Sequence, residues 1–259
     1  MIARGLLLAT AVTAALPAFA QEGDDTRRWR IGLGPQLVPS YPGADRTSVR
    51  PLIDIDRVRG DAPFAFEAPD ESAGFPLLRD DRFSFGPAVG FEGRRRSRDA
   101  GGVGRVGRTV ELGGFVQVQP IEPLRLRAEL RQGIGGHEGL VANLGADYLL
   151  RDADRWLFSA GPRVTLANRR YHRAYFGVTP DGAARSGLPV YDVDGGVQAV
   201  GGTVGLLRQF SPRWGMFGYA KYDRLTGDAA RSPIVRSFGD RNQLSAGIAL
   251  TYSFTTGRR

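Results

Sequence analysis

Residues 242–254 read NQLSAGIALTYSF, and nearly every second side chain in this stretch is apolar. One face carries Leu244, Ala246, Ile248, Leu250, Tyr252 and Phe254. The other face carries small or polar residues, among them Gln243, Ser245, Thr251 and Ser253. A period of two sustained over this length and ending on aromatic side chains is typical of a β-strand that crosses a bilayer with one face in lipid.

The same alternation recurs along the chain. We expect strands at residues 29–38, 47–56, 83–93, 108–118, 124–131, 140–150, 156–166, 196–210, 214–223 and 242–254, with a weaker pair at 63–67 and 74–78. In 196–210 the pattern leaves open which face points outward. The connections 119–123, 151–155 and 211–213 are short, whereas 94–107, 132–139, 167–195 and 224–241 are long and polar. Short periplasmic turns that alternate with long outer loops predict an all-β, transmembrane, antiparallel up-and-down β-barrel of about twelve strands, or about ten without the weaker pair.

The N-terminus predicts export. Arg4 precedes an apolar run at residues 5–16, and Ala18-Phe19-Ala20 follows as a small-x-small cleavage site. We therefore expect a signal peptide at residues 1–20 and a single outer-membrane β-barrel domain at residues 21–259. No later segment offers the roughly 18 consecutive apolar residues of a membrane-spanning helix. The expected location is the outer membrane of a Gram-negative bacterium.

The composition agrees with a barrel and excludes several functions. The chain has 36 glycines and no cysteine, which excludes disulfides, thiolate catalysis and cysteine metal sites. Only Lys221 among its 35 basic residues is a lysine, and the formal net charge is +8. In an exported chain this charge meets outer-membrane lipid and lipopolysaccharide, so we expect no nucleic-acid partner.

Charged residues follow the polar face of several expected strands. We expect seven of them to face the barrel lumen: Glu111, Arg125, Arg127, Glu129, Arg131, Asp147 and Arg163. Such charges either pair with one another and fill a narrow barrel, or line a pore that favours anions. Because side chains can occlude much of the lumen of a barrel of about twelve strands, we favour the filled lumen.

The sequence shows no convincing catalytic, cofactor or metal site. The two histidines, His137 and His172, lie in expected outer loops without a second histidine at ligand spacing. Residues 102–107 contain a GxGxxG pattern, but no strand-to-helix context accompanies it. We therefore expect a protein that is not an enzyme and uses no cofactor.

Several short motifs occur in a fixed order. They include PSYPG at 39–43, GHEG at 136–139, YFGV at 175–178, SGLPVY at 186–191, LTGDAARSPIV at 225–235 and YSF at 252–254. In this combination the chain resembles the MipA/OmpV family of outer-membrane proteins from about residue 29 to residue 254. The motif positions are Tyr41, Gly43, His137, Tyr175, Gly177, Ser186, Gly187, Leu188, Pro189, Tyr191, Gly227, Asp228, Ser232 and Pro233.

The resemblance implies a β-barrel that interacts with the lytic transglycosylase MltA. In that family the barrel is regarded as a scaffold that joins the murein hydrolase to a penicillin-binding synthase during cell-wall growth. The motif residues fall mostly on the outer loops, whereas a murein hydrolase works on the periplasmic side. Their glycines, prolines and short polar side chains suit turns, so we expect the two longest loops to fold over the barrel mouth as a lid.

Two other functions remain open from the sequence alone. A small channel for a modest, anionic solute would use the arginine-rich lumen. An outer-membrane hydrolase would need His137 or His172 as its base.

Residues 255–259 extend past Phe254, whereas barrels usually end on the aromatic residue itself.

Overall fold

The structure is a computed structural model that describes residues 26–80 and 82–257. The expected signal peptide at residues 1–20 lies outside the described residues. Among the described residues, no helix has both the length and the apolar character needed to cross a membrane.

Twelve strands and four short α-helices make up the described chain. The strands are β1 (Arg27–Pro39), β2 (Thr47–Arg59), β3 (Ala73–Gly74), β4 (Leu78–Arg79), β5 (Phe83–Glu92), β6 (Thr109–Ile121), β7 (Leu124–Ile134), β8 (Leu140–Asp152), β9 (Trp156–Ala167), β10 (Gly196–Gln209), β11 (Trp214–Leu225) and β12 (Asn242–Thr256). The helices are the 3₁₀ turn η1 (Ser97–Ala100), α1 (Arg169–Phe176), α2 (Pro180–Ser186), α3 (Gly227–Arg231) and α4 (Pro233–Phe238).

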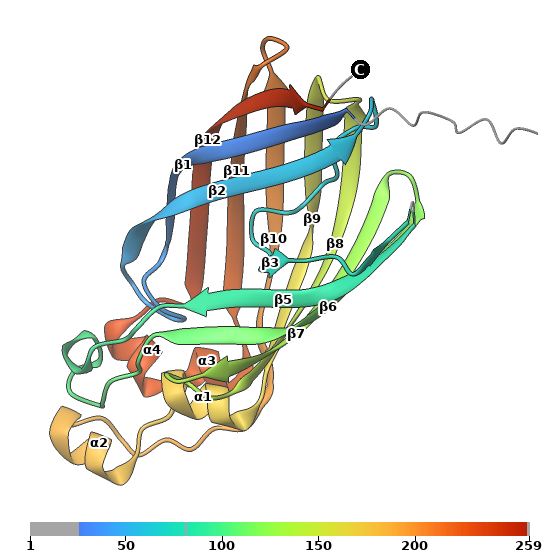
Figure 1. Cartoon of the computed structure of the whole chain (residues 1–259). Helices are drawn as coiled ribbons and strands as arrows, with labels where there is room; N and C mark the ends of the chain where they lie inside the picture. Colours follow the sequence, from blue (N-terminus) through green and yellow to red (C-terminus); the bar gives the residue numbers. More distant parts are fainter. Residues whose placement is uncertain (1–25, 81, 258–259) are drawn as a thin grey trace, which may run out of the picture.

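All strands belong to one antiparallel sheet in the order β2-β1-β12-β11-β10-β9-β8-β7-β6-β5-β3, with β4 also paired to β5. Figure 1 shows this sheet curled into a barrel-like wall, with the helices gathered at one end and with the start of β1 and the end of β12 at the other. The first and last long strands meet, since Leu33 of β1 pairs with Leu250 of β12. Among the described residues, no ladder joins β2 to β3, β4 or β5. We call this gap the seam.

The period of two places apolar side chains outside and polar ones inside, as expected. On β12 the outward residues Leu244 and Leu250 are 61% and 54% exposed, whereas Gln243 and Thr251 are buried. The outward leucines of β7, for example Leu130, are exposed in the same way. An apolar outer face with a polar interior is the arrangement of a barrel that crosses a bilayer, and the predicted fold class is confirmed.

The weaker pair of expected strands differs from the prediction. Residues 63–67 form no strand, and 74–78 are represented by β3 and β4, which are two residues each. The wall therefore has ten long strands within a twelve-stranded sheet. Pro63 and Pro76 remove backbone donors that a full strand would need, which explains why regular pairing fails here.

The ambiguous face of β10 has a local cause. Its ladder with β9 shifts register between Val197 and Ala199, so Gln198 is an extra residue in the strand. A bulge of this kind interrupts the alternation. Val197 and Val200 consequently both point outward, while Gln198 and Ala199 are both buried.

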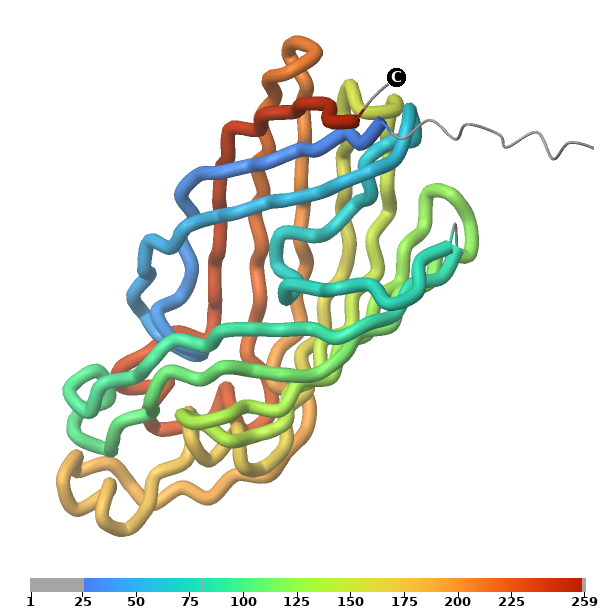
Figure 2. Tube along the Cα trace, in the orientation of Figure 1, coloured from blue at the N-terminus to red at the C-terminus, as the bar shows by residue number. Residues whose placement is uncertain are grey.

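The helices form a packed lid at the long-loop end of the barrel. We define the lid as the two loops 168–195 and 226–241, which carry α1 to α4. Tyr175 and Phe176 of α1 are fully buried and pack with Val235 of α4 and with Leu225, the last residue of β11. The opposite end, which we call the short-turn end, carries the connections β6–β7, β8–β9 and β10–β11 (Figure 2).

Candidate functional site

The connection after β2 turns into the barrel instead of completing the wall. Residues 60–72, the plug segment, begin at Gly60, whose φ of +57° suits a residue without a Cβ. Phe64, Phe66 and Ala68 are buried. Phe66 and Ala68 pack against inward-facing apolar residues of the wall: Leu52, Leu149, Leu157, Leu207, Phe217, Tyr219 and Ala249. This cluster gives the plug segment a hydrophobic anchor inside the lumen.

Arginines of the wall hold the aromatic residues of the plug segment. The guanidinium groups of Arg28 and Arg30 lie 5.1 and 4.8 Å from the ring centre of Phe64, and that of Arg125 lies 5.1 Å from Phe66. Cation–π contacts at this distance become stronger when water is excluded. The backbone N–H of Phe64 also donates to the Asp154 carboxylate at 2.9 Å. The segment is therefore attached to the wall by apolar, cation–π and hydrogen-bond contacts.

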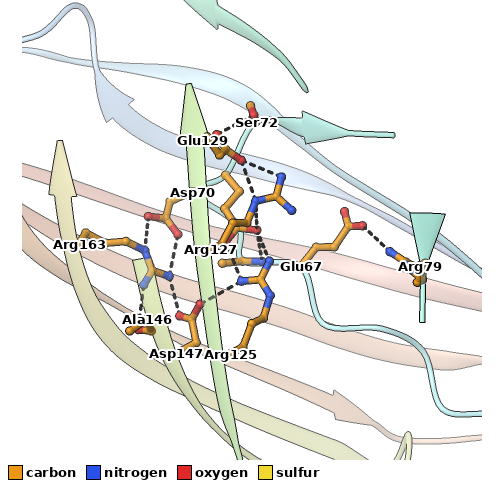
Figure 3. Close-up of polar contacts among 12 residues, drawn as sticks. Glu67, Asp70, Ser72, Arg79, Arg125, Arg127, Glu129, Ala146, Asp147 and Arg163 are labelled. Atoms are coloured by element: carbon orange, nitrogen blue, oxygen red, sulfur yellow. Dashed lines mark hydrogen bonds and ion pairs between the residues drawn. The ribbon is translucent and has the colours of Figure 1, made fainter. Parts of the chain in front are cut away.

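The far end of the plug segment joins a buried chain of alternating charges (Figure 3). Glu71 accepts two hydrogen bonds of 2.7 Å from Arg125, and Arg125 donates to Asp147 at 3.0 Å. Asp147 also accepts from Arg163 at 2.6 Å, and Arg163 donates to Asp70 at 2.9 and 3.2 Å. Bidentate pairs of this kind are strong and fix geometry.

Asp70 connects the plug segment to three strands. Besides Arg163 of β9, it accepts a hydrogen bond of 3.1 Å from Thr203 of β10. It also lies 3.4 Å from the ammonium nitrogen of Lys221 of β11, which pairs with Asp223 at 2.9 Å. A single carboxylate thus joins the plug segment to three consecutive strands of the wall, β9, β10 and β11.

A second chain of charges continues toward the long-loop end. Arg127 pairs with Glu129 at 2.7 Å, and Arg131 pairs with both Glu129 and Glu111. Ser72, the last residue of the plug segment, donates to Glu129 at 2.7 Å. All seven charged residues that the sequence places in the lumen therefore lie in these two chains.

The network leaves little space at mid-height and larger cavities toward both ends. A gap of about 20 Å³ remains among Asp70, Glu71, Arg127 and Arg163, which is room for one water molecule. Cavities of about 730 and 510 Å³ flank residues 62–66 at the short-turn end. A cavity of about 220 Å³ lies on the other side, beneath the lid.

Neither histidine is placed as a free catalytic base. His137 is 2% exposed, and its Nδ1 accepts from the Gly139 N–H at 2.9 Å. Its Nε2 must then carry the proton that is shared with Glu111 at 3.0 Å. His172 donates through Nδ1 to the Asp194 carbonyl at 2.6 Å, and burial lowers its pKa. Within the described ranges, no group of three or more His, Cys, Asp or Glu side chains could hold a metal ion.

The motif residues of the long loops lie in the lid and its contacts. Ser232 donates to the Phe176 carbonyl at 2.6 Å, and the Asp228 carboxylate accepts from the Asp194 N–H at 2.9 Å. Gly187 has a φ of +72°. Two of the motif residues that were expected to suit turns do not form tight turns. Gly177 has an ordinary φ of −78°, and Pro233 is the first residue of α4.

The motif residues Tyr41 and Gly43 also contact the lid: Tyr41 packs in one cluster with Tyr175, and the Asp240 N–H donates to the Gly43 carbonyl at 3.1 Å. The Tyr41 hydroxyl donates to the Asp99 carbonyl and that of Tyr191 to the Asp228 carbonyl. The backbone of Gly43 donates to Gln243 at 3.0 Å. Nearby, Arg95 donates to the Tyr175 carbonyl, and burial lowers the pKa of Arg95. Tyr175 is itself buried, which raises its pKa.

Sequence reasoning missed the plug segment and with it Asp70 and Glu71. The available signal was the pair of prolines at 63 and 69, which makes residues 63–67 a poor strand. A second signal was that Asp70 and Glu71 are adjacent carboxylates in a sequence whose expected strands place several arginines in the lumen.

Comparisons with known proteins give one family and several distant structures. The family model for "MltA-interacting protein MipA" matches residues 31–254. No curated protein matches significantly. Among solved structures, a KdgM porin has a TM-score of 0.38 at 10% identity, over 88% of this chain and 99% of the porin. The CymD monoaromatic hydrocarbon channel has a TM-score of 0.38 at 10% identity, over 92% of this chain and 90% of the channel. The P. putida toluene transporter TodX has a TM-score of 0.34 at 10% identity, over 93% of this chain and 91% of the transporter.

Proposed function

Because this chain belongs to the MipA family of MltA-interacting proteins, we propose that it is an outer-membrane β-barrel with an occluded lumen that docks a murein hydrolase of the MltA type. The hydrolase, a lytic transglycosylase, would bind at the short-turn end, which would face the periplasm. A penicillin-binding murein synthase would be the second partner. In this proposal the protein carries out no reaction of its own.

The observation that carries the proposal is the plug segment. Asp70 and Glu71 connect the segment to β7, β9 and β11, where Arg125, Arg163 and Lys221 compensate their charges. In this proposal the compensated charges at the centre of the lumen obstruct the path that a solute would take. The function is therefore expected to reside on a surface rather than in a pore.

The short-turn end offers more surface than its three brief turns suggest. The plug segment contributes Asp61 and Phe64 to the lining of the 730 Å³ cavity, together with Arg155 and Arg213 from two of the turns. Arg155 pairs with Asp152 at 2.6 Å and stays largely exposed. A concave, arginine-rich surface suits a partner that presents acidic side chains.

Binding of a purified MltA-type lytic transglycosylase to the folded barrel in lipid nanodiscs tests the proposal. We expect the charge reversals Arg155→Glu and Arg213→Glu together to weaken this binding at least about tenfold, because charges at an interface rim act strongly on association. The matched control is Arg170→Glu with Arg173→Glu on α1, at the opposite end. Equal binding by both double variants would reject the short-turn end as the docking surface.

A channel is the second candidate. The cavities on both sides of the plug segment favour it, because release of the segment would join them. In that case the arginine-rich lumen would prefer anions. Ion current through the unmodified protein would distinguish this function from the docking function.

A further inference from the structure

A pocket of about 580 Å³ lies at the long-loop end of the seam, between the start of β2 and the end of β5. The two edges come into contact there. A Cβ added to Gly93 would lie 2.3 Å from the Ser40 carbonyl oxygen and 2.5 Å from Nη2 of Arg50. No ladder pairs the described residues of β2 with those of β5, so this contact is made without strand pairing. The pocket therefore marks the place where an open wall meets the loops.

The lining of this pocket is strongly basic. Its charged residues are Arg46, Arg50, Arg94, Arg96 and Arg108 with the two carboxylates Glu92 and Asp99. Asp99 is already paired with Arg46 at 3.1 Å. The guanidinium groups of Arg94 and Arg108 are exposed, and neither has a hydrogen-bond or ion-pair partner among the residues that the structure describes. A guanidinium group without a partner can donate two parallel N–H bonds, and this geometry matches the oxygens of a phosphate group.

The same pocket has an apolar flank. Val49 of β2 and Phe91 of β5 line it, and they are 71% and 72% exposed. Both point away from the lumen, toward the side where the bilayer would lie. The apolar surface continues along the two edges of the seam with Ile53 and Phe85. A soluble anion would contact the arginines and leave this surface uncovered.

From these two features we infer that the pocket binds the lipid A portion of lipopolysaccharide. The phosphates of this acylated disaccharide contact Arg94 and Arg108, and its acyl chains cover Val49 and Phe91 along the seam. The inference shares with the proposed function only the orientation of the barrel, with the long-loop end outward. Binding of a hydrolase at the short-turn end does not enter into it.

Native mass spectrometry of the folded full chain in detergent tests this assignment. The probe is diphosphorylated lipid A, and the comparison ligands are dephosphorylated lipid A and phosphatidylglycerol. We expect the diphosphorylated form to bind about tenfold more tightly than either comparison ligand, and Arg94→Gln with Arg108→Gln to remove this preference. The matched control, Arg170→Gln with Arg173→Gln on α1, keeps it.

Two further measurements make the test decisive. Phe91→Ser removes the larger of the two apolar side chains that flank the pocket without touching an arginine, and we expect weaker binding of diphosphorylated lipid A by this variant too. A heat-modifiable band on a gel checks that each variant folds. Equal binding of the two lipid A forms, equal binding of phosphatidylglycerol, or an unchanged preference in the Arg94/Arg108 variant would each overturn the assignment.

Discussion

Replacement of Asp70 by asparagine should loosen the plug segment while leaving the wall intact. The side chain keeps its size but loses the charge that faces Arg163 and Lys221, and it is only 6% exposed. Removal of one member of a buried ion pair costs about 3–5 kcal/mol. Arg163 keeps Asp147 and Lys221 keeps Asp223, so we expect a cost near the lower end, about 3 kcal/mol.

Hydrogen exchange of the plug segment measures this loss. A cost of about 3 kcal/mol raises the equilibrium constant for release roughly 150-fold. The Phe64 N–H, bonded to Asp154 only while the segment is docked, should exchange faster by a similar factor. Glu67→Gln is the matched control, because the pair of Glu67 with Arg79 is 3.5 Å long and about 40% exposed on both sides. In Glu67→Gln we expect the exchange rate of the Phe64 N–H to change less than about fivefold. Unchanged exchange in Asp70→Asn would refute the role of the ion pairs.

Three further predictions concern the lid. Burial lowers the pKa of His172 below its ordinary 6.5, so an open lid binds a proton more readily than a closed one. Lid stability should therefore be complete above about pH 6.5 and decrease below it, and protease cleavage within 168–195 should show this step in the native chain but not in His172→Phe. Ser232→Ala loses the bond to the Phe176 carbonyl and the cap of the Ile234 N–H, and should destabilise the lid by about 1–3 kcal/mol in thermal unfolding. Gly187→Ala should cost about 1–2 kcal/mol in the same assay from its positive φ alone, because nothing lies within 4 Å of the added Cβ.

The wall of the barrel was predictable from the sequence because, in each long strand, apolar residues alternate with polar ones and so identify the outer and the inner face. In β7, for instance, leucines alternate with Arg125, Arg127 and Glu129, and the structure places the first set outside and the second inside. A strand that separates lipid from a polar lumen has no other way to arrange its side chains. The positions of the short turns followed from the same alternation.

The plug segment was not predictable by this reasoning, because its contacts are remote in sequence. Asp70 meets Arg163 and Thr203, which are 93 and 133 residues away along the chain. Residues 63–67 alternate like a strand, yet Phe64 and Phe66 pack on the inside of the wall. The alternation of apolar and polar residues does not show whether the apolar face meets lipid or packs inside a filled lumen. The bulge at Gln198 shows the same limit on a smaller scale, since one extra residue reverses the faces.

Single-channel current across a planar bilayer is the most direct test of the occluded lumen. The samples are the folded protein and the double variant Asp70→Asn with Glu71→Gln, which removes the two carboxylates that join the plug segment to Arg125 and Arg163 of the wall. If the plug segment occludes the lumen, the unmodified protein gives no steady current and the double variant gives stable current steps. Steady current of equal size from both samples would contradict this occlusion.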